Sequence, residues 1–248
     1  MRNKDFYISK NEKIMQSLID KHDAGDGKKN FVKDGIVNPE VWFSLSPEKE
    51  KIMFLLKESY EKDKNIKRIS DLTKWICKEK CTEICDRNFE CGKCGADGKT
   101  FNPIAEWVYG INCIFEGKEA EYDSYLGVAH KDYINQRDEL LKNVAVINLK
   151  KSDGINVSNN DDLYYAAAAD KEELIKQIEL INPSLIICGS TYGMLRCLYT
   201  DMETLTDIKN GACIYNGRKI IATYHPSNPG SGKMKYDNVM KLYKSLLK

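Results

Sequence analysis

Length, composition and charge limit what this chain can be. Its 248 residues suit one decorated domain better than two, and a hydrophobic content of 42% is enough for a sizeable core. No stretch approaches the roughly 20 apolar residues of a membrane-spanning helix, and Met1–Lys10 lacks the apolar core of a signal peptide. We therefore expect a cytoplasmic protein with no membrane partner. A net charge of +1 provides no global attraction to nucleic acid, so any such binding must use a local patch.

Helical and strand-like patterns alternate along the chain. A short amphipathic helix near 11–21 belongs to an N-terminal helical extension over residues 1–50, and polar loops are expected at 21–29 and 152–162. Further helices are expected over 122–142, 171–180 and 234–247. Four nearly continuous apolar runs suit strands that are buried on both faces. These runs are Ile52–Leu56, Val144–Leu149, Leu185–Cys188 and Ile220–Thr223.

This alternation implies right-handed crossovers and a parallel sheet. We predict a single α/β domain over residues 1–248 with three layers, in which helices flank a central four-stranded parallel sheet. In such sheets ligands bind beyond the carboxyl ends of the strands. Polar residues follow all four apolar runs, which predicts a functional site at that edge. They are Lys57–Tyr60, Asn148–Lys151, Gly189–Thr191 and His225–Ser227.

The strand ends offer different chemistries. A proline follows His225 and stops the strand, so its imidazole is held where it can donate to developing negative charge, or simply forms a turn. The carboxamide of Asn148 matches the edge of a pyrimidine, or ties down the next loop. Glu58 can orient a water or face a developing cation, or form a solvated pair with Lys57. Gly189–Ser190 opens an expected helix whose N–H groups suit a phosphate, or only caps that helix.

Five of the nine cysteines are crowded between positions 77 and 94. Disulfides are rare in a reducing compartment, so metal binding explains the cluster better than a disulfide framework, with free thiols as the alternative. The segment CGKCG resembles the knuckle of rubredoxins and zinc ribbons, and a helix over 74–85 would align three further cysteines. We predict a Cys-rich insertion over residues 74–99 that binds zinc or an iron–sulfur cluster. The expected ligands are Cys81, Cys85, Cys91 and Cys94, with Cys77 as an alternative to one of them.

In this order the strand-end motifs resemble those of the uracil-DNA glycosylase superfamily. They are FLLKES at 54–59, NLKK at 148–151, INPSLIICGS at 181–190 and HPS at 225–227. The resemblance covers roughly position 51 to the C-terminus, and is particularly close to a divergent prokaryotic group with LKE and NLKK forms. Lys57 departs from the superfamily pattern, which has glycine there and a proline soon after. A long side chain at Lys57 is expected to narrow the base pocket or to bind phosphate, so we expect weak or no excision of plain uracil.

The resemblance implies hydrolysis of the N-glycosidic bond of a damaged or modified base in single- or double-stranded DNA. His225 would stabilise charge on the departing base, Asn148 would read the base edge, and Glu58 would position water or stabilise the sugar cation. The extruded base would lie against an aromatic ring, for which Tyr60 and Phe101 are the candidates, although Phe101 also suits plain core.

Contacts to the DNA strand or its phosphates are expected along the same edge. The residues are Lys57, Lys150, Gly189, Ser190, Ser227 and Lys233. Two other functions remain open at this point: a nucleotide- or nucleic-acid-binding protein that uses the same pocket without catalysis, and a metal-stapled module of a larger assembly. We expect a monomer.

Overall fold

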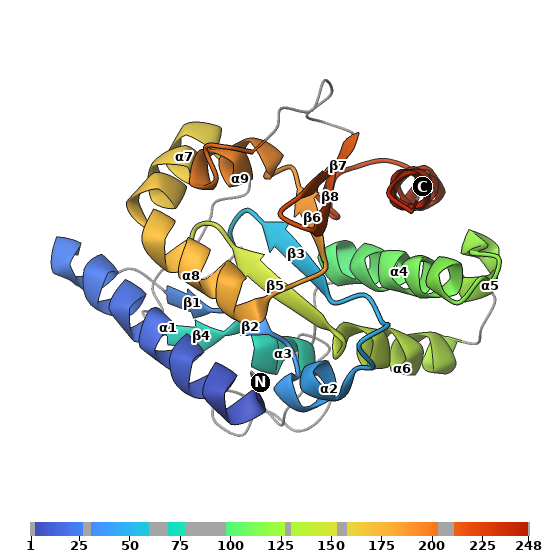
Figure 1. Cartoon of the computed structure of the whole chain (residues 1–248), viewed down its shortest axis with the longest axis horizontal. Helices are drawn as coiled ribbons and strands as arrows, with labels where there is room; N and C mark the ends of the chain where they lie inside the picture. Colours follow the sequence, from blue (N-terminus) through green and yellow to red (C-terminus); the bar gives the residue numbers. More distant parts are fainter. Residues whose placement is uncertain are drawn as a thin grey trace.

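The computed structural model describes residues 3–26, 31–59, 69–77, 98–126, 130–152, 158–202 and 211–247. Within these ranges the chain is a mixed α/β fold (Figure 1). The helices are α1 (Lys4–Asp26), α2 (Pro39–Ser44), α3 (Leu72–Cys77), α4 (Gly98–Phe115), α5 (Tyr122–Leu126), α6 (His130–Leu141), α7 (Asn160–Ala169), α8 (Lys171–Ile181), α9 (Tyr192–Leu198) and α10 (Gly232–Ser245). The strands are β1 (Phe31–Lys33), β2 (Gly35–Ile36), β3 (Ile52–Leu56), β4 (Ile69–Asp71), β5 (Val144–Asn148), β6 (Leu185–Gly189), β7 (Gly211–Tyr215) and β8 (Arg218–Thr223).

The main sheet has six strands in the order β2-β5-β3-β6-β8-β7. The four predicted strands lie side by side in its middle and run parallel to one another. At the two edges, β2 pairs antiparallel with β5 and β7 pairs antiparallel with β8. The α/β prediction is confirmed, but the sheet is wider than the four-stranded parallel sheet that we predicted, and it is mixed.

The edge strand β7 joins β8 through a tight hairpin turn. Asn216 and Gly217, between the two strands, have φ values of 47° and 73°. Positive φ at both central residues is the geometry of a two-residue hairpin, for which Asn-Gly is the strongest short-range signal. This connection explains why the added strand runs antiparallel to its neighbour.

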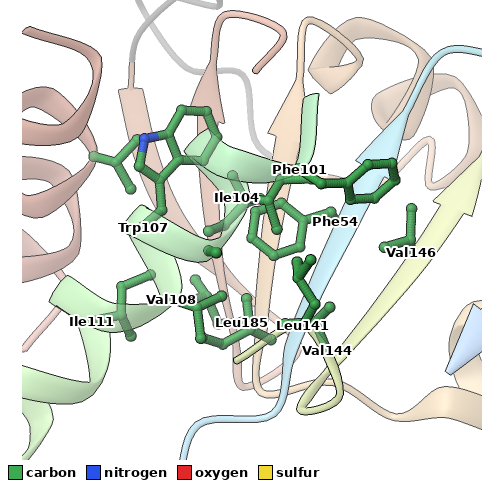
Figure 2. Packing of buried hydrophobic residues seen from close by; sticks show 14 of the residues in the cluster. Phe54, Phe101, Ile104, Trp107, Val108, Ile111, Leu141, Val144, Val146 and Leu185 are labelled. Atoms are coloured by element: carbon green, nitrogen blue, oxygen red, sulfur yellow. The ribbon is translucent and has the colours of Figure 1, made fainter. Parts of the chain in front are cut away.

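Side chains of the central strands alternate between two cores, because successive residues of a strand face opposite sides of the sheet. In β3, Phe54 and Leu56 face a core shared with α4 and α10, whereas Met53 and Leu55 face a core shared with α8 and α9. Figure 1 shows these helix groups on opposite sides of the sheet, and Figure 2 shows the first core around Phe54 and Trp107. Burial on both faces is the physical reason for the continuous apolar runs.

The predicted helices over 171–180 and 234–247 correspond to α8 and α10, whereas the helix predicted over 122–142 corresponds to two, α5 and α6. The N-terminal fifty residues contain strands β1 and β2 as well as helices α1 and α2. Among the described residues, no helix is both long enough and apolar enough to span a bilayer.

Glu50 ties the amino edge of the sheet to the C-terminal helix. Its carboxylate accepts hydrogen bonds from the hydroxyls of Ser184 (2.6 Å) and Tyr243 (2.9 Å), and it pairs with Lys219. Burial opposes ionisation of this carboxyl group, but the hydrogen bonds from the ammonium and the two hydroxyls outweigh burial. They hold the pKa of Glu50 below its ordinary 4.5.

We expect Glu50→Gln to lower the free energy of unfolding by about 1.5–3 kcal/mol near neutral pH, because a charge-assisted contact is lost. A lowered folded-state pKa stabilises the protein above the pKa of the unfolded chain, and this stabilisation is lost as the pH falls through the folded pKa. The difference between wild type and variant should therefore shrink below about pH 4.5. Urea unfolding at several pH values measures it. Glu172→Gln, at an exposed ion pair with Lys176, is the matched control, and a pH-independent loss in Glu50→Gln would contradict the interpretation.

Candidate functional site

The polar ends of all four central strands lie at the carboxyl edge of the sheet, because these strands run parallel to one another. In the register of the sheet, Asn148 lies opposite Leu56, and Gly189 lies opposite Thr223. The pairing of β3 with β5 continues beyond the strands, because the N–H groups of Leu149 and Lys150 donate to the carbonyls of Leu56 and Lys57. Glu58 follows directly, so Lys57, Glu58 and the NLKK segment leave the sheet together.

Gly189 allows the ends of β3, β6 and β8 to approach one another closely. A Cβ atom added at Gly189 would lie 2.9 Å from Leu56 Cδ2, 3.1 Å from Pro226 Cδ and 3.5 Å from His225 Cα. A side chain at this position would therefore separate the strand ends. The glycine that sequence reasoning assigned to phosphate binding thus has a packing role that brings His225 close to Leu56.

Ser190 fixes the backbone of His225. It adopts a positive φ of 61°, which is uncommon for a residue other than glycine. In this conformation its Oγ accepts the N–H of His225 at 2.9 Å, and its own N–H donates to the carbonyl of Thr223 at 2.8 Å. Unusual backbone conformations of this kind concentrate at functional sites.

The imidazole of His225 is oriented by the residue two positions later. The backbone N–H of Ser227 donates to His225 Nδ1 at 3.2 Å, and Ser227 Oγ lies 2.7 Å from the same nitrogen. Because Nδ1 accepts a backbone N–H, the proton of the neutral ring resides on Nε2. The N–H of the neutral His225 ring can therefore act as a donor. The Ser227 hydroxyl, which we predicted to contact phosphate, lies beside the imidazole.

Asn148 is almost completely buried, with 2% of its surface exposed. Its Nδ2 donates to Ser59 Oγ at 2.9 Å. This contact joins the end of β5 to the segment that follows β3. Sequence reasoning did not single out Ser59, although it lies in the FLLKES motif.

Glu58, which precedes Ser59 in the chain, has a buried carboxylate oxygen. Its Oε2 is shielded from solvent, and no residue in the described part of the chain donates a hydrogen bond to it. Most buried polar atoms in proteins have a partner, and an unmatched one is a reason to consider a functional role. The side chain as a whole is half-buried, as is that of Lys57.

The remaining predicted contacts are distributed unevenly. Lys150 is half-buried beside Lys57, whereas Lys233 is exposed and lies 3.4 Å from Asp123. Phe101 lies in the first turn of α4 and is 6% exposed, so its ring belongs to the core that Figure 2 shows around Phe54. Tyr60 lies outside the described residues.

The loop after His225 is held by hydrogen bonds that the sequence did not reveal. Lys235, in the first turn of α10, donates to the carbonyls of Pro226 and Asn228, both at 2.9 Å. Ser231 caps the same helix by accepting the N–H of Met234. Lys235 therefore holds the loop that precedes α10 in its shape.

The predicted metal ligands Cys81, Cys85, Cys91 and Cys94 lie outside the described residues, as does the side chain of Cys77. In the part of the chain that the structure describes, no three His, Cys, Asp or Glu side chains gather in a group that could hold a metal ion. Four cysteines whose side chains the structure describes form no disulfide bond. They are Cys113, Cys188, Cys197 and Cys213.

Comparisons of the sequence with known proteins identified no relative of this chain. No protein-family model matches the chain, and no curated protein matches its sequence significantly. The assignment of a function therefore rests on the residues themselves.

Proposed function

We propose that the chain is a uracil-DNA glycosylase-like protein that hydrolyses the N-glycosidic bond of a damaged or modified base in DNA. The observation that carries this proposal is the arrangement of Glu58, Asn148 and His225 after three of the four central parallel strands, β3, β5 and β8, on one edge of the sheet. These residues lie in the motifs that resemble the superfamily. Four adjacent parallel strands with helices on both faces support the same three-layer fold, to which β2 and β7 are additions.

The spacing of the strands suits a base held between Asn148 and His225. β5 and β8 are separated by β3 and β6, so three interstrand spacings divide them, about 14 Å in all. When the side chains of Asn148 and His225 extend toward each other across this distance, room for a planar heterocycle remains between them. The carboxamide of Asn148 then matches the hydrogen-bonding edge of the base.

The proposed reaction breaks the bond between the sugar C1′ and the base nitrogen. The electron pair of that bond leaves with the base, and the Nε2–H of His225 donates to the base oxygen where negative charge develops. Water adds to C1′, and its proton passes to the carboxylate of Glu58. The buried Oε2 of Glu58 supports this role, because an oxygen that lacks a donor in the described chain can accept one from water.

Lys57 is expected to decide whether uracil is a substrate. We expect weak release of uracil from single-stranded DNA by the wild type and an increase of roughly 10-fold or more in Lys57→Gly, because the side chain narrows the pocket. Liquid chromatography of the free base measures the release, and Lys49→Gly, at the amino edge of the sheet, is the control. If both proteins bind the DNA but release no base, the protein binds nucleic acid without catalysis.

We also propose that residues 74–99 form a metal-binding insertion with zinc or an iron–sulfur cluster. Elemental analysis of anaerobically purified protein should find the metal of about one zinc ion or one iron–sulfur cluster per chain. Cys91→Ser should lose this metal, and the insertion should unfold, because thiolate sites contribute folding free energy. Cys197→Ser, at an exposed free thiol, should keep the metal and serves as the control. Wild-type protein without bound metal would contradict this prediction.

A further inference from the structure

A buried polar network reaches the end of β5 from the N-terminal segment. The side chain of Asp34, between β1 and β2, is 0% exposed. Its Oδ2 accepts the backbone N–H of Asn148 at 2.8 Å, and its two oxygens accept from Lys151 Nζ at 2.6 and 2.8 Å. Gln177 Nε2 donates to Oδ1 at 3.0 Å. Together these donors fill the roughly four lone-pair sites of a carboxylate.

Asp34 supplies an acceptor that the sheet itself does not provide. Leu149 donates its N–H to Leu56 of β3, and successive N–H groups of a strand point to opposite sides, so the N–H of Asn148 points away from β3. On that side β2 consists only of Gly35 and Ile36, which pair with residues before Asn148. The carboxylate therefore takes the place of a strand carbonyl where the ladder ends.

The backbone around this network holds the NLKK segment along its length. Val32 donates its N–H to the carbonyl of Lys151 at 2.7 Å, and Phe31 forms an antiparallel bridge with Ser152. At the other end Tyr7 of α1 accepts the N–H of Ile36 at 2.8 Å. Residues 31–36 thus run beside the end of β5 and are themselves fixed by α1.

The ion pair is better explained by geometry than by stability. Burial lowers the pKa of the Lys151 ammonium, and the charge of Asp34 opposes this shift. Lys151 also donates to Gln177 Oε1 at 3.0 Å. Well-packed apolar residues often match a buried ion pair in stability, so a role in fixing local structure accounts for this pair better than a gain in stability does.

We propose that Asp34 is a positioning residue that, with Lys151 as its counter-ion, fixes the backbone and thereby the carboxamide of Asn148. The N-terminal segment is then part of the architecture of the site. The idea that Asn148 binds the edge of a base rests on the proposed function. The hydrogen bond from the Asn148 backbone N–H to Asp34 does not depend on that function.

Two double variants separate positioning from charge. Asp34→Asn with Lys151→Met removes both charges but keeps an oxygen that can accept the Asn148 N–H, whereas Asp34→Leu with Lys151→Met removes the acceptor as well. The exchange rate of the Asn148 backbone amide and the side-chain amide signal of Asn148 are measured by NMR in full-length protein. As a matched control, Glu50→Gln with Lys219→Met removes an ion pair at the opposite edge of the sheet.

We expect exchange at Asn148 to rise by roughly 10- to 100-fold, relative to Ala145 in the same protein, only in the Leu variant. The side-chain signal of Asn148 should move in that variant alone. If the Leu variant does not fold, Asp34→Glu takes its place, since it keeps the charge but displaces the carboxylate, and the Asn148 signals should again move. Unchanged Asn148 signals in a folded Leu variant or in Asp34→Glu would overturn the proposal.

Binding of a fluorescein-labelled, uracil-containing single-stranded oligonucleotide by the wild type is measured separately. Failure of that binding, with the expected NMR changes intact, would count against the proposed function and not against positioning.

Discussion

His225→Ala and Asn148→Ala are each expected to reduce base release from DNA by roughly 100- to 1000-fold. The first removes a donor to the charge that develops on the departing base, and the second removes the carboxamide that binds the edge of that base. Single-turnover rates with a substrate that the wild type cleaves measure the loss. Neither change should unfold the protein. His225 is partly exposed, and the network that fixes β5 uses the backbone of Asn148 rather than its side chain.

His22→Ala is the control for the loss of a histidine, because His22 pairs with Asp170 and is not one of the proposed catalytic residues. That variant should keep the wild-type rate of base release. If His225→Ala and His22→Ala had equal rates, the imidazole of His225 would have no part in the reaction.

The single variants Asp34→Asn and Lys151→Met are expected to lose about 3–5 kcal/mol of stability each, because each leaves a buried charge without its partner. The two side chains are both 0% exposed, so water does not compensate for the loss. Urea unfolding of both singles and of the double variant forms a double-mutant cycle. The double variant should lose much less than the sum of the singles.

Single variants that each lose less than about 1 kcal/mol would contradict this prediction, since losses of that size are typical of exposed pairs. The exposed pair of Lys176 and Glu172 provides the comparison, and Lys176→Met should fall within that range.

The central strands could be predicted from the sequence because burial on both faces leaves a continuous apolar run. The predicted range Ile52–Leu56 is also the observed extent of β3, and the other three predictions agree with the structure to within two residues. The edge strands gave weaker signals. β2 has only Gly35 and Ile36, too few for a pattern, whereas the Asn-Gly turn before β8 could have revealed β7.

Two helices were obscured by local composition. Residues 152–162 are rich in polar side chains and suggested a loop, yet Asn159 caps α7 and acidic residues occupy its first turn, which are helix-start signals. Pro103 lies inside α4, where proline is unfavourable, and that helix was not predicted.

The geometry of the candidate site was predictable in part. As the sequence predicted, the parallel strands bring the polar residues that follow them to one edge of the sheet. Tertiary contacts could not be predicted in the same way. Asp34 lies more than a hundred positions before Asn148, and no local pattern distinguishes its buried carboxylate from an exposed one. Ser59 and Lys235 likewise acquire their roles only from the fold.

The most direct test of the proposed function is mass spectrometry of free bases released from DNA. The folded, full-length protein is incubated with single- and double-stranded oligonucleotides that each carry one modified base, such as hypoxanthine, xanthine, uracil or 5-hydroxymethyluracil. The proposal predicts that the wild type releases a free base from at least one of them, leaves an abasic site in the DNA, and loses this activity in His225→Ala. If the wild-type protein released no base from any oligonucleotide, the assignment as a glycosylase would be wrong.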